Sequence, residues 1–428
     1  MNILFVTPSQ VSSGEAVTAL HMAEWLCAEG CKVNFLASEF TGAFMRTRLA
    51  NVVSTLGPDL RTNQYTWQAA LTNFRPAAVV FADYPLLAFH SGATPLRDEA
   101  WESDLDRIDA RLFTLDHLGY AQRSRIVFFG PALATLGFER IPPIPAHMHV
   151  LLPCPLHDPH NRALRGCPFR YWRDDPEQNH IESVDARTPY VRSPEELLVL
   201  HFTSHWACQG AELLRHPYYS LLPQVISGFL SGLGLPVTVL SVNNGSLLPE
   251  VDSGNVRIIN ARPVDPAQFE RLLLASDLVI TENRISVSLG KSICHLRPCA
   301  ILHNSYSLLD IMEGKAGSSR ILAEKMERAR FGSVFPFEVF PIWSRGDLEE
   351  LGIFDETCLN GAFAAVEIFA GEAGARQFRN LLTDRSTREG MQAAQEGYLR
   401  RLRSLPTPLQ VLVETPSQAR SSETAPSA

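Results

Sequence analysis

Short apolar runs alternate with segments of helical periodicity, and this alternation limits the folds open to the chain. Residues 2–7 (NILFVT) form an apolar run, residues 15–29 carry apolar side chains at helical spacing, and residues 32–38 (KVNFLAS) are again apolar and strand-like. Repeated strand-helix-strand units build a parallel sheet with helices on its faces. The first 38 residues therefore predict the start of a doubly wound α/β sheet.

The same pattern occurs twice along the chain. It continues in the first half and, after a Pro-rich polar stretch over residues 142–194, begins again. Further strands are predicted at residues 77–85, 125–130, 149–153, 197–205, 236–244, 255–260, 277–283 and 299–305. A repeated strand-helix series on both sides of a Pro-rich stretch indicates two domains of similar architecture.

The length of the chain supports that division. At 428 residues it exceeds the size at which one hydrophobic core usually keeps growing. We expect an α/β protein with two Rossmann-like, doubly wound domains facing across a cleft. The predicted parts are a first domain over 1–194, a second over 195–385, a helix over 386–405 that crosses back to the first domain, and a mostly disordered tail over 406–428.

Composition and charge limit the kinds of partner that the protein is expected to bind. The formal net charge is -8, and no run of Lys or Arg could neutralise successive phosphates, so no nucleic-acid partner is expected. The sequence shows no secretion signal and no window of 18 apolar residues, which predicts a cytoplasmic protein without a membrane span. The eight cysteines are scattered and fit reduced thiols. The oligomeric state is left open.

Ligands in open α/β sheets bind outside the carboxyl ends of the strands, often against helix N-termini. The first strand-to-helix turn supplies Ser12, Ser13 and Gly14 as small polar residues before a helix that begins near Glu15. Its glycines lack the spacing of a dinucleotide fingerprint, so NAD is not expected. We interpret this turn as a candidate ligand-binding loop.

Two turns in the second half have the residues expected for a phosphate site. Thr203, Ser204 and His205 follow a buried strand, where hydroxyl groups and backbone N–H groups either bind a phosphate or cap an ordinary helix. The segment 275–302 (ASDLVITENRISVSLGKSICHLRPCAIL) carries a strand, a polar turn and a helix start. Its candidate donor-binding residues are Glu282, Asn283, Ser286, Ser288 and Lys291.

The domain plan and the segment 275–302 resemble the GT-B glycosyltransferases, which bind a nucleotide sugar in the C-terminal domain. By this resemblance, Ser288 matches the helix-start Ser or Thr that contacts the donor phosphates, and Glu282 and Asn283 lie where the donor sugar approaches. Lys291 falls where many inverting members have a ribose-binding Glu. A lysine suits a diphosphate, or it lies on a solvent-facing side of the helix.

The resemblance also implies that the first turn, with Ser12, Ser13 and Gly14, is an acceptor-binding loop. Many inverting members have Gly-His after the first strand, and the His is the general base that deprotonates the acceptor hydroxyl. Gly14 takes the Gly position here and Glu15 the His position, and a buried carboxylate can act as a base because burial raises its pKa. The alternative is that Glu15 is only a favourable acid in the first turn of a helix. The replacement of His by Glu also leaves a noncatalytic or a retaining member open.

Asp83 is the second candidate base, since it ends a predicted buried strand; the alternative is a simple turn residue. Asp116 and His117 are weaker candidates, because adjacent residues of a strand point to opposite faces.

The resemblance implies a glycosyltransferase that moves a sugar from a nucleotide diphosphate donor to a small acceptor, with inversion. No cofactor and no metal is expected, because no DxD motif lies near a strand end. Two alternatives stay open. One is a sugar-nucleotide 2-epimerase, for which the second domain offers mainly Glu282 and His303; the other is a noncatalytic nucleotide-sugar-binding protein. The sequence does not specify the sugar, the base or the acceptor.

Overall fold

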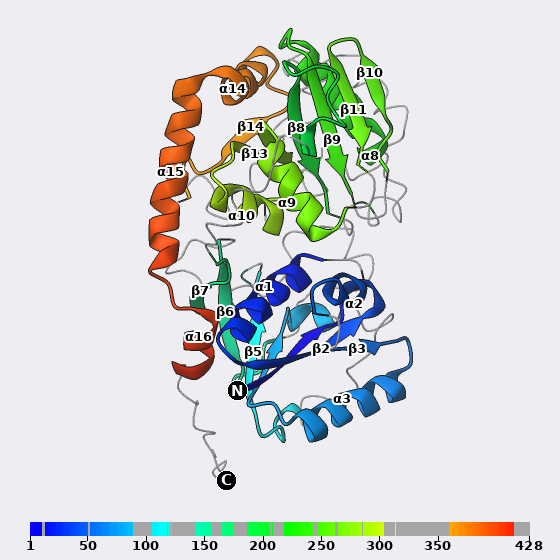
Figure 1. The fold of residues 1–428 in the computed structure, drawn as a ribbon, viewed down its shortest axis with the longest axis vertical. Helices are drawn as coiled ribbons and strands as arrows, with labels where there is room; N and C mark the ends of the chain where they lie inside the picture. The colour runs from blue at the N-terminus through cyan, green and yellow to red at the C-terminus, as the bar shows by residue number, and fades with distance from the viewer. Residues whose placement is uncertain are drawn as a thin grey trace. The chain divides into compact units, whose positions relative to one another are not determined.

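The chain divides into two compact units in a computed structural model (Figure 1). Unit 1 comprises Met1–Ser124, Ile141–Arg173 and Leu405–Ala428, and unit 2 comprises Arg125–Arg140 and Asp174–Ser404. The structure describes residues 1–10, 13–49, 52–88, 104–117, 119, 121, 143–155, 165–173, 186–204, 208, 218–243, 247–261, 264–284, 286–303, 313 and 359–414.

Unit 1 contains a parallel seven-stranded sheet in the order β3-β2-β1-β4-β5-β6-β7. Its strands are β1 (Asn2–Thr7), β2 (Lys32–Ser38), β3 (Val53–Leu56), β4 (Ala78–Phe81), β5 (Arg111–Leu115), β6 (His149–Cys154) and β7 (Cys167–Arg170). Its helices are α1 (Gly14–Ala28), α2 (Glu39–Arg46), α3 (Leu60–Phe74), a short 3-10 helix η1 (Pro85–Ala88) and α16 (Pro408–Glu414). The strand order reverses between β1 and β4, so a crevice for ligands is expected at their carboxyl ends.

Local chemistry explains where the helices of unit 1 begin. The side chain of Ser38 accepts a hydrogen bond from Thr41 N at 3.1 Å and caps α2, and the carboxylate of Asp59 accepts one from Thr62 N at 2.8 Å and caps α3. Each cap satisfies an N–H group that has no partner inside the helix. β4 is buried along its whole length, as a strand with helices on both faces must be.

Unit 2 repeats this plan. Its seven-stranded sheet has the order β10-β11-β9-β8-β12-β13-β14, in which only the pair β10 and β11 is antiparallel among the described strands. The strands are β8 (Leu197–Phe202), β9 (Val237–Val242), β10 (Val251–Ser253), β11 (Val256–Asn260), β12 (Leu278–Thr281), β13 (Cys299–His303) and β14 (Ala364–Glu367). The helices are α8 (Tyr218–Ser231), α9 (Pro266–Ala275), α10 (Val287–Cys294), α14 (Glu372–Thr383) and α15 (Arg385–Arg403). The order reverses between β8 and β12.

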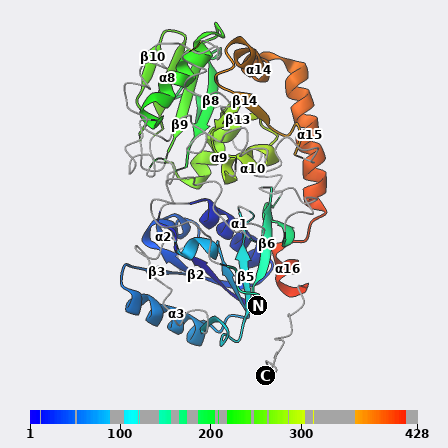
Figure 2. The same ribbon diagram turned by 180° about the vertical axis from the view of Figure 1, so that it is seen from behind.

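The last two helices belong to different units. The long helix α15 packs against α14 and α10 within unit 2 (Figure 1). The short helix α16 packs against α1 and β7 within unit 1, and it lies beside β6 in the reverse view (Figure 2). Leu412 is fully buried there, and Arg170 N donates a hydrogen bond to Pro406 O at 3.2 Å.

The predicted fold class is confirmed, because each half forms a doubly wound α/β sheet. The predicted strand at 125–130 lies outside the described residues. Strands β3, β5, β7, β10 and β14 lie outside the predicted strand ranges; around β7 the Pro-rich composition indicated only loops and a linker.

The division into units differs from the predicted domains in detail. The expected boundary at 194 falls inside unit 2, and the helix expected to cross back at 386–405 packs within unit 2 as α15. Within the predicted tail of residues 406–428, Pro408–Glu414 form α16, whose apolar residues are buried in unit 1.

Candidate functional site

Three elements of unit 1 bring polar side chains together at the carboxyl edge of its sheet. Glu15 lies in the first turn of α1, Asp83 lies two residues after β4, and His117 lies two residues after β5. Asp83 and His117 are 5% and 4% exposed. His117 Nδ1 is 3.8 Å from Asp83 Oδ2, so an imidazole and a carboxyl group face each other at the carboxyl edge of the sheet, beside the switch point of unit 1.

The hydrogen bonds around His117 define its tautomer. Thr18 Oγ1 donates its one hydrogen to Gly14 O at 3.1 Å, in the first turn of α1. His117 Nε2 is 3.1 Å from the same Thr18 oxygen, so Nε2 must carry the hydrogen and donate it. In the neutral ring Nδ1 is then the basic nitrogen, and Nδ1 is the atom that faces Asp83.

Asp83 has the properties of a group that exchanges protons near neutral pH. Burial raises the pKa of Asp83 to about 7, against the opposing effect of the neighbouring His117, and the negative charges of Asp116 and Glu15 add to the rise. An acid or base with a pKa close to the working pH is the most effective proton-transfer group.

Glu15 and Asp116 complete the cluster. Glu15 Oε2 is a buried atom without a hydrogen-bond partner among the described residues. Asp116 Oδ2 accepts a hydrogen bond from Ala121 N at 2.9 Å, which ties the chain after β5 to the strand end. Of the other residues predicted here, Ser13 precedes α1 without a side-chain capping bond, Gly14 is the first residue of α1, and Ser12 lies outside the described residues.

The carboxyl edge of unit 2 carries a second buried polar cluster, which we call the Glu282 cluster: Glu282, His201, Thr203 and Tyr219. Glu282 is 1% exposed; its Oε2 is 3.0 Å from His201 Nε2, and its Oε1 contacts Thr203 Oγ1 and lies 3.3 Å from Tyr219 Oη. The predicted residues Thr203 and Glu282 are thus brought together, across the switch point between β8 and β12.

The helix α10 begins as predicted, with Ser286 as its N-cap. Ser286 Oγ accepts a hydrogen bond from Ser288 N at 3.2 Å. Lys291 does not face solvent: its Nζ lies 2.8 Å from Glu270 Oε1, and both residues are buried. The charge of Lys291 therefore serves an ion pair between α10 and α9.

Other polar groups end the neighbouring strands of unit 2. Asn283 N donates to Thr281 Oγ1 at 3.0 Å, and His303 Nδ1 lies 3.6 Å from Glu367 Oε2 at the ends of β13 and β14. The predicted His205 lies outside the described residues. In the part of the chain that the structure describes, no group of three His, Cys, Asp or Glu side chains has the geometry of a metal site, and no helix is long and apolar enough to cross a membrane.

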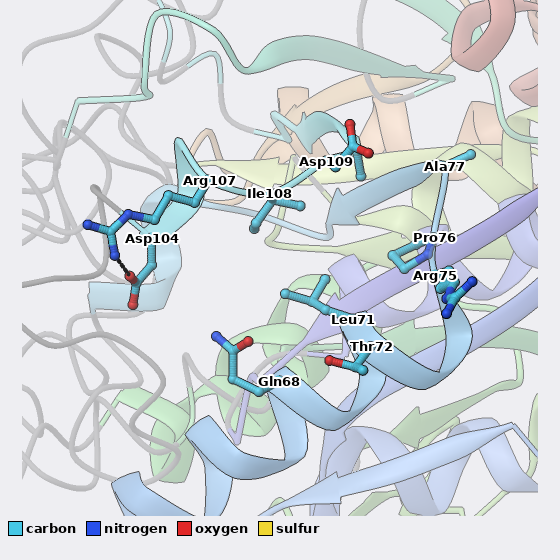
Figure 3. A pocket seen from close by; sticks show the side chains of 11 residues that line it. Gln68, Leu71, Thr72, Arg75, Pro76, Ala77, Asp104, Arg107, Ile108 and Asp109 are labelled. Atoms are coloured by element: carbon cyan, nitrogen blue, oxygen red, sulfur yellow. Dashed lines mark ion pairs between the residues drawn. The ribbon is translucent and has the colours of Figure 1, made fainter.

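A pocket of about 690 Å³ lies at the opposite, amino end of β4 and β5 (Figure 3). It is lined by the end of α3 and by the turns that precede the two strands, including Arg75 and Asp109. None of the predicted site residues lines it, because ligand chemistry was expected at the carboxyl ends of the strands.

Sequence reasoning gave too little weight to His117 and missed His201 and Tyr219. The alternation rule places Asp116 and His117 on opposite faces, but β5 ends at Leu115 and the rule no longer applies beyond it. His201 lies inside an apolar strand, where a histidine indicates only a core position. The available signal was its place next to the strand's carboxyl end, together with a carboxylate after the adjacent strand.

Solved structures with a similar fold are numerous. A spinosyn forosaminyltransferase, SpnP, superimposes with a TM-score of 0.51 at 13% identity, over 97% of this chain and 98% of that chain. The glycosyltransferase SnogD from Streptomyces nogalater gives 0.48 at 13% identity, over 97% and 98% of the two chains. A putative UDP-N-acetylglucosamine 2-epimerase from Listeria monocytogenes gives 0.46 at 9% identity, over 97% of each chain.

With two doubly wound sheets and a full-length match to SpnP, the chain has the GT-B fold. Residues 22–419 match the model of DUF6365, a family of unknown function, and the chain belongs to that family. A search of curated proteins found no match to the sequence. At these identities the structural likeness establishes the fold alone.

Proposed function

We propose that the protein is a glycosyltransferase that moves a sugar from a nucleoside diphosphate donor to a hydroxyl group of a small acceptor, with inversion and without a cofactor. In such a displacement the acceptor oxygen attacks the anomeric carbon, the bond to the diphosphate breaks, and a base removes the hydroxyl proton. The protein must supply the base and must stabilise the charge that develops on the diphosphate.

The observation that carries the proposal is the pair of Asp83 and His117 in unit 1. Two buried proton acceptors 3.8 Å apart can both contact one acceptor hydroxyl group, and the pKa of Asp83, about 7, suits proton transfer. Glu15 is the third candidate base, since its Oε2 is buried at the same strand edge. We assign the proton transfer to this cluster, with Asp83 and His117 ahead of Glu15.

Donor binding is proposed for the carboxyl edge of unit 2. The first turn of α10 offers the hydroxyl groups of Ser286 and Ser288 and the positive end of a helix dipole to a phosphate. Ser204 follows β8 at the same edge. Lys291 contributes to this site through its ion pair with Glu270 rather than by contact with a phosphate.

Product analysis with a panel of nucleotide sugars and hydroxylated acceptors tests the proposal. Formation of a nucleoside diphosphate together with a glycoside supports it, and the loss of that activity in Asp83→Asn and His117→Gln assigns the chemistry to unit 1. A panel that gives no glycoside, although the nucleotides bind, would leave a noncatalytic binding protein.

A sugar-nucleotide 2-epimerase is the second candidate. It needs carboxylates and imidazoles around the sugar, and unit 2 carries two such pairs, His201 with Glu282 and His303 with Glu367. An epimerised donor formed without any acceptor would favour this function. The same panel therefore separates the two candidates.

A further inference from the structure

The hydrogen bonds of the Glu282 cluster determine which hydroxyl groups remain for a ligand. The hydroxyl groups of Thr203 and Tyr219 donate to Glu282 Oε1, and His201 Nε2 lies 3.0 Å from Oε2. His201 is held in turn by Ser241, whose Oγ is 3.1 Å from Nδ1. Glu282 therefore has protein partners at both of its oxygens.

Thr203 has one hydroxyl hydrogen, and that hydrogen is used inside the cluster. Thr203 Oγ1 contacts Glu282 Oε1 and lies 3.0 Å from Tyr219 Oη, and both contacts are at buried side chains. A phosphate oxygen is an acceptor only, so it could bind Thr203 only if the bond within the cluster were broken.

Ser204, the next residue along the chain, differs from Thr203. Its Oγ is a buried atom that has no hydrogen-bond partner among the residues that the structure describes. The turn after β8 therefore contains one hydroxyl group with an engaged hydrogen and one whose hydrogen has no acceptor among the described residues.

We infer that His201, Tyr219 and Glu282 are positioning residues of the donor site, which turn Thr203 inward so that the Ser204 hydroxyl faces the ligand. Glu282 takes no part in binding the donor sugar, in contrast to the role that the family resemblance implies for it. The inference rests on the proposed function, since it assumes that a nucleoside diphosphate binds at this edge of unit 2.

Calorimetric binding of UDP, dTDP, UDP-glucose and dTDP-glucose to the full chain tests the inference. Ser204→Ala should weaken the binding of nucleoside diphosphates roughly 10-fold or more, as the loss of a hydrogen bond to a charged group does. Thr203→Val should weaken it less, and Thr203→Ser, the matched control, should bind like the wild type. Thermal unfolding of each variant checks that it is folded.

The variant Glu282→Gln distinguishes a residue that only positions the turn after β8 from one that contacts the donor sugar. If Glu282 acts only through the turn, the ratio of the dissociation constants for UDP-glucose and UDP should equal that of the wild type, even where both constants change. If Glu282 binds the sugar, only the sugar-bearing ligand should lose affinity, and the inference is overturned. Should Glu282→Gln fail to fold, Tyr219→Phe gives the same comparison by removing one donor to the carboxylate.

The two proposals fail in different ways. A wild-type protein that binds none of the four nucleotides removes the donor site, and with it the proposed function. The positioning role is overturned if Ser204→Ala leaves nucleotide binding unchanged. It is also overturned if Glu282→Gln weakens the binding of UDP-glucose but not that of UDP. Both results leave the proposed function intact.

Discussion

Asp83 determines how the protein should respond to pH if it is the base. Its pKa of about 7 predicts that turnover rises with pH through about 7 and is constant above it. Asp83→Asn cannot accept the proton, so turnover should fall by roughly 100-fold to 10,000-fold and the pH dependence should be lost. Steady-state rates from pH 5 to pH 9 check this.

Glu15→Gln is the matched control at the same strand edge. If Glu15→Gln loses both turnover and the rise of turnover with pH, while Asp83→Asn keeps both, the base is Glu15, as the family resemblance implies. Donor affinity should change little in either variant, because neither residue lies in unit 2.

The same carboxyl group should affect stability with the opposite sign of pH dependence. Its pKa is higher in the folded protein than the ordinary value of 3.8, so the folded state keeps the proton longer than the unfolded chain. The stability that Asp83 contributes is fully present below about pH 4 and is lost as the pH rises to about 7. Relative to the wild type, Asp83→Asn should therefore gain up to about 1.4 kcal/mol per pH unit between those limits.

Urea unfolding of both proteins at pH 5, 6, 7 and 8 measures this difference. A difference in unfolding free energy that does not change with pH would show that Asp83 is ionised throughout. His117→Gln provides a second comparison, since it removes the neighbour that opposes the rise in the pKa of Asp83.

At the residue scale, the sequence favoured the carboxylates Glu15 and Asp83 and gave their partner His117 too little weight. Asp83 could be placed because a polar residue after a wholly apolar strand must emerge at the sheet edge. His117 could not be placed with confidence from periodicity, because its direction depends on where β5 ends and on the hydrogen bond to Thr18, which is 99 residues away in the sequence.

Among the elements, α10 and α9 are joined by the buried pair of Lys291 and Glu270. Lys291→Met should lower the free energy of unfolding by about 3–5 kcal/mol, because the carboxylate of Glu270 stays buried without its lysine. The double variant Lys291→Met, Glu270→Gln should recover part of the loss. Chemical denaturation measures both, and a single variant as stable as the wild type would show that the pair is unimportant for stability.

Helices α14 and α15 offer two glycines with opposite expectations. A Cβ atom at Gly374 would lie 2.5 Å from Glu367 O and 2.9 Å from Phe229 Cε2, whereas a Cβ atom at Gly390 meets nothing within 4 Å. Gly374→Ala should destabilise unit 2 by about 1–3 kcal/mol through overpacking. Gly390→Ala should stabilise it by up to about 1 kcal/mol through helix propensity.

Thermal unfolding of the two alanine variants, side by side, measures these effects. Equal melting temperatures would contradict the close packing of α14 on β14. The sequence alone predicts the same gain in stability for Gly374→Ala and Gly390→Ala, because it reveals only helix propensity. The close approach at Gly374 could not be predicted, since it involves residues from three separate elements.

On the scale of the whole molecule, the sequence predicted the two sheets well and the path of the chain poorly. Apolar runs and their spacing are local properties, so most strands of both units could be recognised, although β3, β5, β7, β10 and β14 were missed. The return of α16 to unit 1 depends on contacts between residues nearly 400 positions apart, such as those between α16 and α1, and no local pattern contains that information.

Truncation after Ser404 tests the role of α16. The shortened chain should lose the buried contacts of Leu412 and the hydrogen bond from Arg111 Nη1 to Val413 O, which is 3.1 Å long. Hydrogen exchange should then become faster in β6, β7 and α1 of unit 1, and stay unchanged in unit 2. Truncation after Glu414, which keeps α16, is the control; equal protection in both shortened chains would show that α16 adds nothing to unit 1.

The placement of α16 also has a consequence for the order in which the protein is made. A ribosome releases unit 1 in pieces, and the helix that completes it emerges only after all of unit 2 has been synthesised. Until α16 has been synthesised, unit 1 is incomplete, and the surface that α16 covers in the folded protein is exposed to water. A chimera that exchanges one half of this chain for that of a relative would need to carry residues 405–414 with the N-terminal half.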